Sequence, residues 1–338
     1  MPRDRNRWSP AVARSIACCL AICVACALSA CGGGYTGGST PREIADAEAQ
    51  TAENMRVVDA DIAREERRVD ADDVTAAQTP APPPVPASAP AGEGVFSAAD
   101  RRSFTKLAGR LPGREGVAVS GLKPDFDVQR LGSLRSGVAW STAKVPVAMA
   151  AINAGVADQG SLVAAITASD NAAAERLWSA LGRGRSAADA ATAQLRAAGD
   201  TKSRVQSDRL RAGYTAFGQT AWALTDQVRF TAGMACTAAG KKVLKLMNRV
   251  VAGQRWGLGA TGNPAQFKGG WGPGISPGSG DGWLDRQMGI VVISGRPLAV
   301  TIATDAGNHD SGTRALTALA RWVASHAGTK GLPRRSRC

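Results

Sequence analysis

The strand-like segments of this sequence lie at the two ends of its last 245 residues, and this placement constrains the fold more than any other feature. Between them, residues 160–235 are rich in alanine and read as several helical pieces with glycines at the breaks. Strands this far apart must pair across the whole domain to bury their apolar faces. We therefore predict an α/β fold, with an antiparallel sheet formed from both chain ends and flanked by helices, plus a mainly helical lobe. The predicted strands are Gly116–Leu122, Asp127–Leu134, Gln266–Trp271, Gln287–Ser294 and Leu298–Asp305.

Three further segments are predicted as helices of the same domain, which we place at residues 94–338. Ser97–Leu111 has apolar residues at helical spacing, and Ser97 precedes Asp100 by three residues in an N-terminal capping pattern. Ser141–Ala154 is apolar enough to be a buried helix, and Ser311–Ser325 is amphipathic. A region of this length can bury a sizeable core.

The first 31 residues have the layout of a targeting segment. Four arginines fall within the first 14 residues, and the apolar stretch Ser15–Leu28 follows them, as in a secretory signal. An uncleaved membrane anchor is the alternative, although the stretch is short for a span. The ending Leu28-Ser29-Ala30-Cys31 resembles a bacterial lipobox. This resemblance implies a signal peptide over residues 1–30, fatty acids such as palmitate on Cys31, and a lipoprotein anchored on the extracytoplasmic side of a bacterial cell membrane.

Residues 31–93 are predicted to tether the domain to that anchor. Glycine runs over residues 32–38 favour no single backbone state, and the six prolines of residues 79–90 favour an extended spacer. Arg42–Asp73, between them, has the composition of a solvated helix with a thin apolar stripe. The tether is acidic, with twelve Asp and Glu against five Arg over residues 32–93.

The domain is basic, with 32 Lys and Arg against 15 Asp and Glu over residues 94–338. Such a charge can favour nucleic acid, anionic lipid or an acidic wall polymer. Aromatic residues make up only 5% of the chain and do not alternate with basic ones, so we expect no nucleic-acid partner. The two histidines, His309 and His326, lie beside no cysteine or carboxylate pair at ligand spacing. We therefore expect no metal, and nothing in the sequence indicates a cofactor.

Four of the seven cysteines fall within the signal segment, and Cys31 is the lipidation site. Cys236 and Cys338 remain in the exported chain, where two thiols can oxidise to one disulfide that ties the carboxyl tail to the body. Two free thiols, one buried and one at a frayed end, are the alternative. The sequence leaves both open.

Ser141-Thr142-Ala143-Lys144 is the first of three short motifs that can carry chemistry. Residues three apart share one face of a helix, so the lysine amine can lie beside the serine hydroxyl. A serine alcohol becomes a good nucleophile only when a base takes its proton, and a lysine can do so when burial lowers its pKa. The same spacing occurs at Ser103-Phe104-Thr105-Lys106, but Ser141 opens the most apolar helix of the domain.

The second motif is Ser169-Asp170-Asn171, ahead of a predicted helix at Ala172–Leu181. Ser169 could pass a proton to a leaving group, and Asn171 could donate a hydrogen bond to a bound amide. Serine, aspartate and asparagine also cap helix N-termini, and the two roles are compatible.

The third motif is Lys268-Gly269-Gly270-Trp271, on a predicted strand before a glycine-rich turn. A lysine beside glycines on an edge strand brings positive charge and bare backbone amides close to a ligand. The alternative is a solvent-exposed lysine next to a flexible turn.

In this order, the three motifs resemble the active-site set S-x-x-K, S-D-N and K-T-G of the penicillin-recognising serine enzymes. The resemblance is to the class A β-lactamase branch and covers residues 96–327 in element order, with local agreement over Trp140–Val145 and Ala165–Asn171. The lipoprotein signal and the alanine-rich composition also resemble the β-lactamase-fold lipoproteins of mycobacteria and their relatives. The resemblance implies a β-lactamase-like fold.

It also implies a role for each motif residue. Ser141 is the implied nucleophile, Lys144 the base and Ser169 the proton relay. The implied substrate-binding residues are Asn171 as an amide ligand, Lys268 as a catalytic cation that faces a carboxylate, and Gly269, Gly270 and Trp271 on the strand. The implied oxyanion hole consists of the backbone amides of Ser141 and Trp271.

Three features depart from the family pattern. Only 27 residues separate Ser141 from Ser169, which shortens the helical lobe, and Gly269 lacks the hydroxyl of the third motif. No E-x-x-L-N string follows Asn171, and Asp208 is the only carboxylate at the corresponding spacing. Deacylation in the family depends on a glutamate that positions water, so we expect slow turnover.

The leading interpretation is an exported, monomeric serine hydrolase that is acylated at Ser141 by β-lactam-like or D-peptide amides and deacylates slowly. Its expected partners are a β-lactam or a peptidoglycan-derived peptide, and the membrane through Cys31. A D,D-peptidase-like cell-wall enzyme would share the first chemical step. A non-catalytic lipoprotein that keeps the fold for binding is the third possibility, because a fold does not guarantee a function.

Overall fold

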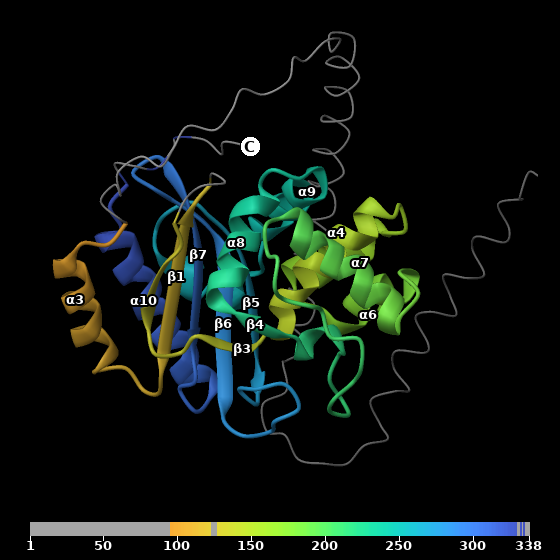
Figure 1. Ribbon diagram of the computed structural model, residues 1–338, viewed down its shortest axis with the longest axis horizontal. Coiled ribbons are helices and arrows are strands. Elements are labelled where there is room, and N and C mark those ends of the chain that lie inside the picture. The colour runs from red at the N-terminus through yellow and green to blue at the C-terminus, as the bar shows by residue number, and fades with distance from the viewer. Residues whose placement is uncertain (1–94, 123–126, 330–331, 333, 335–338) are drawn as a thin grey trace, which may run out of the picture. The chain divides into compact units, whose positions relative to one another are not determined.

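The computed structural model describes residues 95–122, 127–329, 332 and 334 (Figure 1). A five-stranded sheet in the order β2-β1-β7-β6-β5 forms its centre, and each neighbouring pair is antiparallel. Glu115 of β1 lies opposite Thr304 of β7, so the first and last strands of the domain pair directly. The predicted sheet from both chain ends is therefore confirmed. Its strands are β1 (Glu115–Gly121), β2 (Gln129–Gly132), β5 (Ala265–Pro273), β6 (Trp283–Ile293) and β7 (Arg296–Thr304).

Helices cover both faces of this sheet. α3 (Ala98–Ala108) and α10 (His309–His326) pack on one face, and α8 (Leu224–Met234) packs on the other (Figure 1). Successive strand residues point to opposite faces, which divides β1 between two apolar clusters: Val117 and Val119 contact the α10 side, whereas Ala118 contacts the α8 side. The predicted cap of the first helix is present, because Ser97 and Asp100 form a reciprocal capping box.

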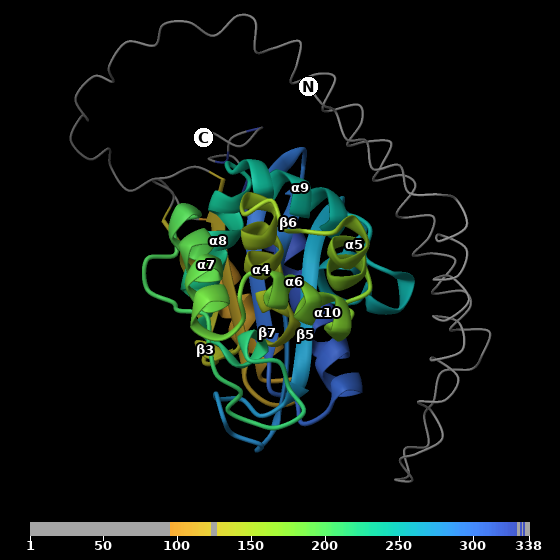
Figure 2. The same cartoon turned by 90° about the vertical axis from the view of Figure 1, so that its right-hand side faces the viewer.

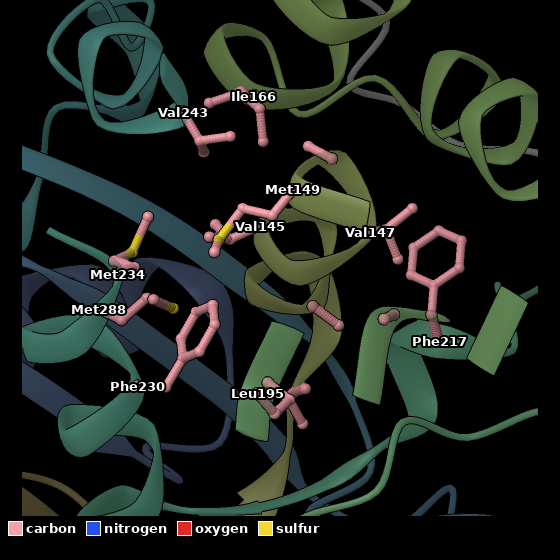
Figure 3. Close-up of a cluster of buried hydrophobic side chains, with 14 of the residues drawn as sticks. Val145, Val147, Met149, Ile166, Leu195, Phe217, Phe230, Met234, Val243 and Met288 are labelled. Atoms are coloured by element: carbon pink, nitrogen blue, oxygen red, sulfur yellow. The ribbon is translucent and has the colours of Figure 1, made fainter. Parts of the chain in front are cut away.

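The helical lobe lies beside the β5 end of the sheet (Figures 1 and 2). Its central helix, α4 (Lys144–Asn153), is buried on every side over its first eight residues. Figure 3 shows Val145 and Met149 on the side of Met234, and Val147 on the side of Phe217. Burial of each such side chain contributes about 1.5–3 kcal/mol, so α4 is firmly positioned. The helices around it are α5 (Gln159–Thr167), α6 (Asn171–Ala180), α7 (Gly184–Ala197) and α9 (Ala238–Met247).

The segment predicted as one helix over residues 141–154 is divided. A 3-10 turn, η1 (Trp140–Ala143), precedes α4. Pro146 explains this boundary, because a proline fits the first turn of a helix but its ring collides with the carbonyl four residues earlier in the interior. Trp140, at φ +47°, keeps the chain from being helical further upstream.

Several elements were not predicted. Two three-residue strands, β3 (Ser136–Val138) and β4 (Ala221–Ala223), form a separate antiparallel pair that is too short to show an alternating pattern in the sequence. α9 and the 3-10 turns η3 (Ala252–Gln254) and η4 (Gly257–Ala260) were also unassigned. The helical prediction for residues 160–235 is wrong over residues 200–223, which contain β4 and the 3-10 turn η2 (Phe217–Gln219) but no α-helix. Backbone amides in this segment bond to the side chains of Asp200, Thr192 and Thr220 in place of helical carbonyls. Among the residues that the structure describes, no helix combines the length and apolar character needed to cross a membrane. The predicted signal peptide and tether lie outside the described residues.

Candidate active site

The three motifs meet in one place, between the start of α4, the turn that joins α5 to α6, and β5. Lys268 Nζ donates a hydrogen bond to Ser169 Oγ at 2.8 Å. Lys144 Nζ donates to the Ser169 carbonyl, lies 3.4 Å from Ser169 Oγ, and donates to Asn171 Oδ1 at 2.8 Å. One serine is therefore in contact with both lysines.

Lys144 is placed as a candidate base by its burial. Lys144 is 1% exposed at the first position of α4. Burial lowers the pKa of Lys144 to about 7, although the negative charge of Asp170 acts in the opposite direction. A lysine with this pKa is substantially neutral near neutral pH, and a neutral amine can accept a proton.

Ser141 lies in η1, three residues before Lys144, and is half-buried. Its hydroxyl makes no hydrogen bond to any residue in the described part of the chain, so it is available to a ligand. The backbone amide of Ser141 faces β5: a Cβ on Gly270 would lie 2.9 Å from that nitrogen. The two segments that carry the predicted oxyanion-hole amides, at Ser141 and Trp271, are therefore adjacent.

Lys268 is fully buried, and it donates to Gly269 O at 2.8 Å as well as to Ser169. Burial lowers the pKa of Lys268 well below its ordinary value, and the nearby charge of Lys144 lowers it further. A positive charge on Lys144 therefore disfavours a second one on Lys268. Lys268 is thus engaged in the internal network, and its predicted role toward a carboxylate stays a prediction.

The turn that carries Ser169 is both strained and capped. Ser169 adopts φ +62°, a conformation that a non-glycine residue adopts at a cost of about 1–3 kcal/mol. Asp170 caps α6 by accepting from Ala173 N at 2.5 Å. The capping role of the second motif is therefore confirmed, with Asp170 as the cap. Ser169 and Asn171 both contact Lys144, and their predicted roles toward a substrate stay predictions.

The glycines of the third motif are explained by close approach. A Cβ on Gly269 would lie 3.1 Å from the indole of Trp256 and 3.5 Å from the ring of Trp271. On the other face of the strand, a Cβ on Gly270 would lie 2.8 Å from Ala139 O. Aromatic rings thus occupy the space beside Gly269, the position at which the K-T-G motif has a hydroxyl side chain.

Arg286 on β6 is a positioning residue that the sequence analysis missed. Its fully buried guanidinium donates to Gly137 O at 3.0 Å, to Val138 O at 3.1 Å and to Gln227 Oε1 at 2.5 Å. Gln227 in turn donates to Thr142 Oγ1 at 3.0 Å. This chain of bonds ties the segment that carries Ser141 to the sheet. Burial lowers the pKa of Arg286 to about 9.

Asp208, the carboxylate at the spacing of the family's glutamate, is exposed. It accepts from Ser207 Oγ at 3.1 Å, while neighbouring Arg209 pairs with Glu175 at 2.8 Å. Neither of these contacts involves Lys144, Lys268 or Ser169, so Asp208 is not part of the lysine network.

The second S-x-x-K occurrence has a structural role. Ser103 lies in α3, where its hydroxyl accepts from Trp322 Nε1 at 3.1 Å and contacts His326 Nε2 at 3.2 Å. These contacts fasten α3 to α10, away from the lysine network.

Cys236, after α8, takes part in a disulfide bond. Cys338 and Cys31 lie outside the described residues, so the Cys236–Cys338 pairing and the lipidation stay predictions. No cluster of three or more His, Cys, Asp or Glu that could hold a metal occurs among the described residues.

The chain matches no protein-family model and no curated protein. Solved structures do match it. One is a β-lactamase from Xanthomonas campestris pv. campestris, which is 19% identical in sequence and has a TM-score of 0.52. The match covers 68% of this chain and 98% of the β-lactamase chain. PBP-A is 16% identical over 68% of this chain and 95% of its own, also at 0.52. A mutant of the last common ancestor of Gram-negative class A β-lactamases is 19% identical over 67% and 97%, at 0.51.

These similarities define the class of protein: a β-lactamase-like α/β domain. In particular, the fold is the one that class A β-lactamases share with a penicillin-binding protein, which confirms the fold that the three motifs implied.

Proposed function

We propose that this chain is an acyl-transferring serine hydrolase that β-lactam-like or D-peptide amides acylate at Ser141. The observation that carries the proposal is the buried contact of Lys144 and Lys268 with Ser169. Lys144 also lies three residues after Ser141, whose hydroxyl is available to a ligand. A hydroxyl in contact with two buried amines, the pKa of each lowered by burial, is suited to moving protons. The network adjoins β5, an edge strand of the sheet.

The acylation step follows from this arrangement. Neutral Lys144 takes the proton of the Ser141 hydroxyl as Oγ attacks the carbonyl carbon of the ligand amide. The backbone N–H groups of Ser141 and Trp271 stabilise the oxyanion. As the tetrahedral intermediate collapses, the C–N bond breaks and Ser169 delivers a proton to the leaving nitrogen. Lys144 supplies the replacement proton, either directly or through the Lys268 bond to Ser169, and an ester remains on Ser141.

Deacylation is proposed to be slow. Water must be activated by a base, and Asp208 is exposed and hydrogen-bonded to Ser207 rather than enclosed. A general base typically contributes about 10²–10⁴-fold, so the acyl-enzyme should persist longer than that of an efficient lactamase by a similar factor.

A D-alanyl peptide is the second candidate substrate, because a D,D-peptidase would use the same nucleophile and base in its first chemical step. The fold, which PBP-A shares, is compatible with either substrate. Ser141 would attack either substrate, and the relative rates at which the chain hydrolyses nitrocefin and a D-Ala-D-Ala peptide distinguish the two candidates. We also propose that Cys31 is lipidated and places the enzyme on the outer side of the cell membrane.

Intact-mass analysis of the purified full chain after exposure to penicillin tests the acylation. We expect a stable adduct on Ser141 that Ser141→Ala abolishes. Ser103→Ala is the matched control, since Ser103 has the same motif spacing but lies in α3, and this variant should label normally. Absence of any adduct favours the non-catalytic alternative, and rapid multiple turnover of nitrocefin contradicts slow deacylation.

A further inference from the structure

Arg211 joins two loops at the end of β5. It belongs to the segment between α7 and β4, and its Nη1 donates to Pro273 O at 2.7 Å and to Ser279 O at 2.9 Å. Pro273 ends β5, and Ser279 lies in the turn that leads to β6; both loops are at the lower end of the sheet in Figure 2. A Cβ on Gly274 would lie 3.1 Å from Nη1, so the guanidinium uses room that glycine leaves. Arg211 thus ties the segment before β4 to the β5–β6 turn.

The same guanidinium covers an aromatic stack that leads to the proposed nucleophile. Arg211 Cζ lies 4.5 Å from the centroid of the Tyr214 ring, where a cation is attracted to the aromatic face. The Tyr214 ring in turn lies 5.3 Å from the ring of Trp140, at an interplanar angle of 54°. Gly213, at φ +82°, supplies the left-handed backbone between Arg211 and Tyr214 that glycine adopts without strain. The stack therefore runs from Arg211 through Tyr214 to the residue that precedes Ser141.

Trp140 contacts both this stack and β5. It is buried, and a Cβ on Gly272 would lie 2.9 Å from its ring. Trp140 also adopts φ +47°, a conformation that a non-glycine residue keeps only where its surroundings impose it. Its Nε1 makes no hydrogen bond to any residue in the described part of the chain, so packing rather than a polar contact of the side chain holds the ring. Loss of the Tyr214 ring would remove one of the contacts that hold Trp140.

A second connection from Arg211 to the nucleophile runs through the backbone. Ile275 lies in the β5–β6 turn that Arg211 bonds, and its carbonyl accepts from Val138 N at 2.9 Å. Val138 is three residues before Ser141. A displacement of this turn would therefore reach the start of η1 at two points, the ring of Trp140 and the amide of Val138.

We propose that Arg211 and Tyr214 are positioning residues for the acylation of Ser141. They hold Trp140 against β5, and so keep the Ser141 hydroxyl and backbone amide in place beside Gly270. The inference rests on the proposed function for the reaction that this placement serves. The role requires the planar fork of arginine, because one guanidinium donates to two carbonyls and also covers a ring; a lysine ammonium has the charge without the plane. A misplacement of about 1 Å in a reacting group can cost about 10²-fold in rate.

Single-turnover acylation of the full chain by penicillin at several concentrations, followed by intact mass, tests the role. It separates the rate constant of the chemical step from the half-saturating concentration. Arg211→Met and Tyr214→Leu should each lower the rate constant about 10–100-fold and leave the half-saturating concentration nearly unchanged. Arg211→Lys should not restore the rate, whereas Tyr214→Phe should acylate as the wild type does, because it keeps the ring. Arg209→Met is the matched control, since Arg209 is an exposed arginine of the same segment and pairs with Glu175 at 2.8 Å.

Hydrogen exchange gives a second readout that does not depend on activity. In Arg211→Met and Arg211→Lys, the amides of residues 138–143 should exchange faster than in the wild type and in Arg209→Met, while the amides of α4 exchange as before. Faster exchange throughout the domain would show general destabilisation instead and would overturn the inference, as would unchanged exchange at residues 138–143.

The kinetic outcomes separate this inference from the proposed function. Recovery of the rate in Arg211→Lys, or an effect confined to the half-saturating concentration, overturns the inference, because either result indicates a charge that binds the ligand. Wild-type rates in Arg211→Met overturn it as well. Absence of any adduct in the wild-type chain refutes the hydrolase proposal, and hydrogen exchange still decides whether Arg211 holds the turn that carries Ser141.

Discussion

Lys268 and Ser169, 99 residues apart in the chain, are joined by a 2.8 Å hydrogen bond in which the lysine donates and the hydroxyl oxygen accepts. Because this oxygen accepts from Lys268, the hydroxyl proton of Ser169 is free to point toward Lys144 or a ligand. The pair therefore defines a direction for proton movement: from the Lys268 amine, through the Ser169 hydroxyl, to the leaving nitrogen of the substrate.

Replacing Lys268 with Met should slow acylation by about 10²–10⁴-fold, because the relay loses one of its proton donors. Stability should change little or rise, since the variant removes a buried amine without a carboxylate partner. Single-turnover acylation by penicillin, followed by intact mass, measures the rate. Lys241→Met, on the exposed face of α9, is the control, and an unaltered rate in the Lys268 variant would exclude the relay.

Acylation should depend on pH through Lys144. The amine acts as a base only when deprotonated, and burial places its pKa at about 7. The acylation rate is therefore expected to rise with pH up to about 7 and then level off. Lys144→Arg retains the positive charge and cannot act as a base, so it should acylate very slowly at every pH. A profile that is flat from pH 5 to pH 9 in the wild type contradicts this role.

Replacing Arg286 with Met should destabilise the domain by about 2–5 kcal/mol. The change leaves buried carbonyls of Gly137 and Val138 without their donor, and each unsatisfied group costs about 1–3 kcal/mol. Urea unfolding measures the difference. Arg130→Met is the matched control, because Arg130 is half-buried and donates to Gly132 O, two residues away, so it should cost far less.

Glu115 should make the domain less stable as pH rises. Burial, with the charge of Asp305, raises the pKa of Glu115 to about 7 from 4.5. Between these values the folded chain keeps a proton that the unfolded chain has lost, so stability falls across this window as pH increases. Glu115→Gln should therefore stabilise the protein by about 1–3 kcal/mol at pH 8 and by little at pH 4. Glu175→Gln serves as the control, and equal effects of Glu115→Gln at both pH values contradict the prediction.

Cys31→Ala should block lipidation and leave a longer precursor. Metabolic labelling with palmitate in a bacterial host, followed by fractionation, tests this. The wild type should label and sediment with membranes, whereas Cys236→Ala should label as the wild type does. Normal palmitate incorporation into the Cys31 variant would refute the lipobox assignment.

The parts of the fold that depend on local pattern could be predicted from the sequence, and those that depend on distant contacts could not. The alternating strands, the Ser97 cap and the order of the three motifs are visible in short windows. Arg286 acts through backbone carbonyls about 60 to 150 positions away, so its neighbours give no sign of its role. His309 was examined only for nearby metal ligands, and Asp285, whose carboxyl contacts its ring, is 24 residues distant on another element.

The boundary between η1 and α4 and the deep burial of α4 affect how this protein can evolve. Ser141 and Lys144, the proposed nucleophile and base, lie just before and at the start of α4, whose first eight residues are buried. In such a packed interior, the gain or loss of a single methylene shifts the neighbouring side chains. Variation in Val145, Val147 or Met149 would displace the reacting groups themselves. New ligand preferences are therefore expected to arise at the half-buried tryptophans that border β5, where the surface can change while the catalytic centre stays in place.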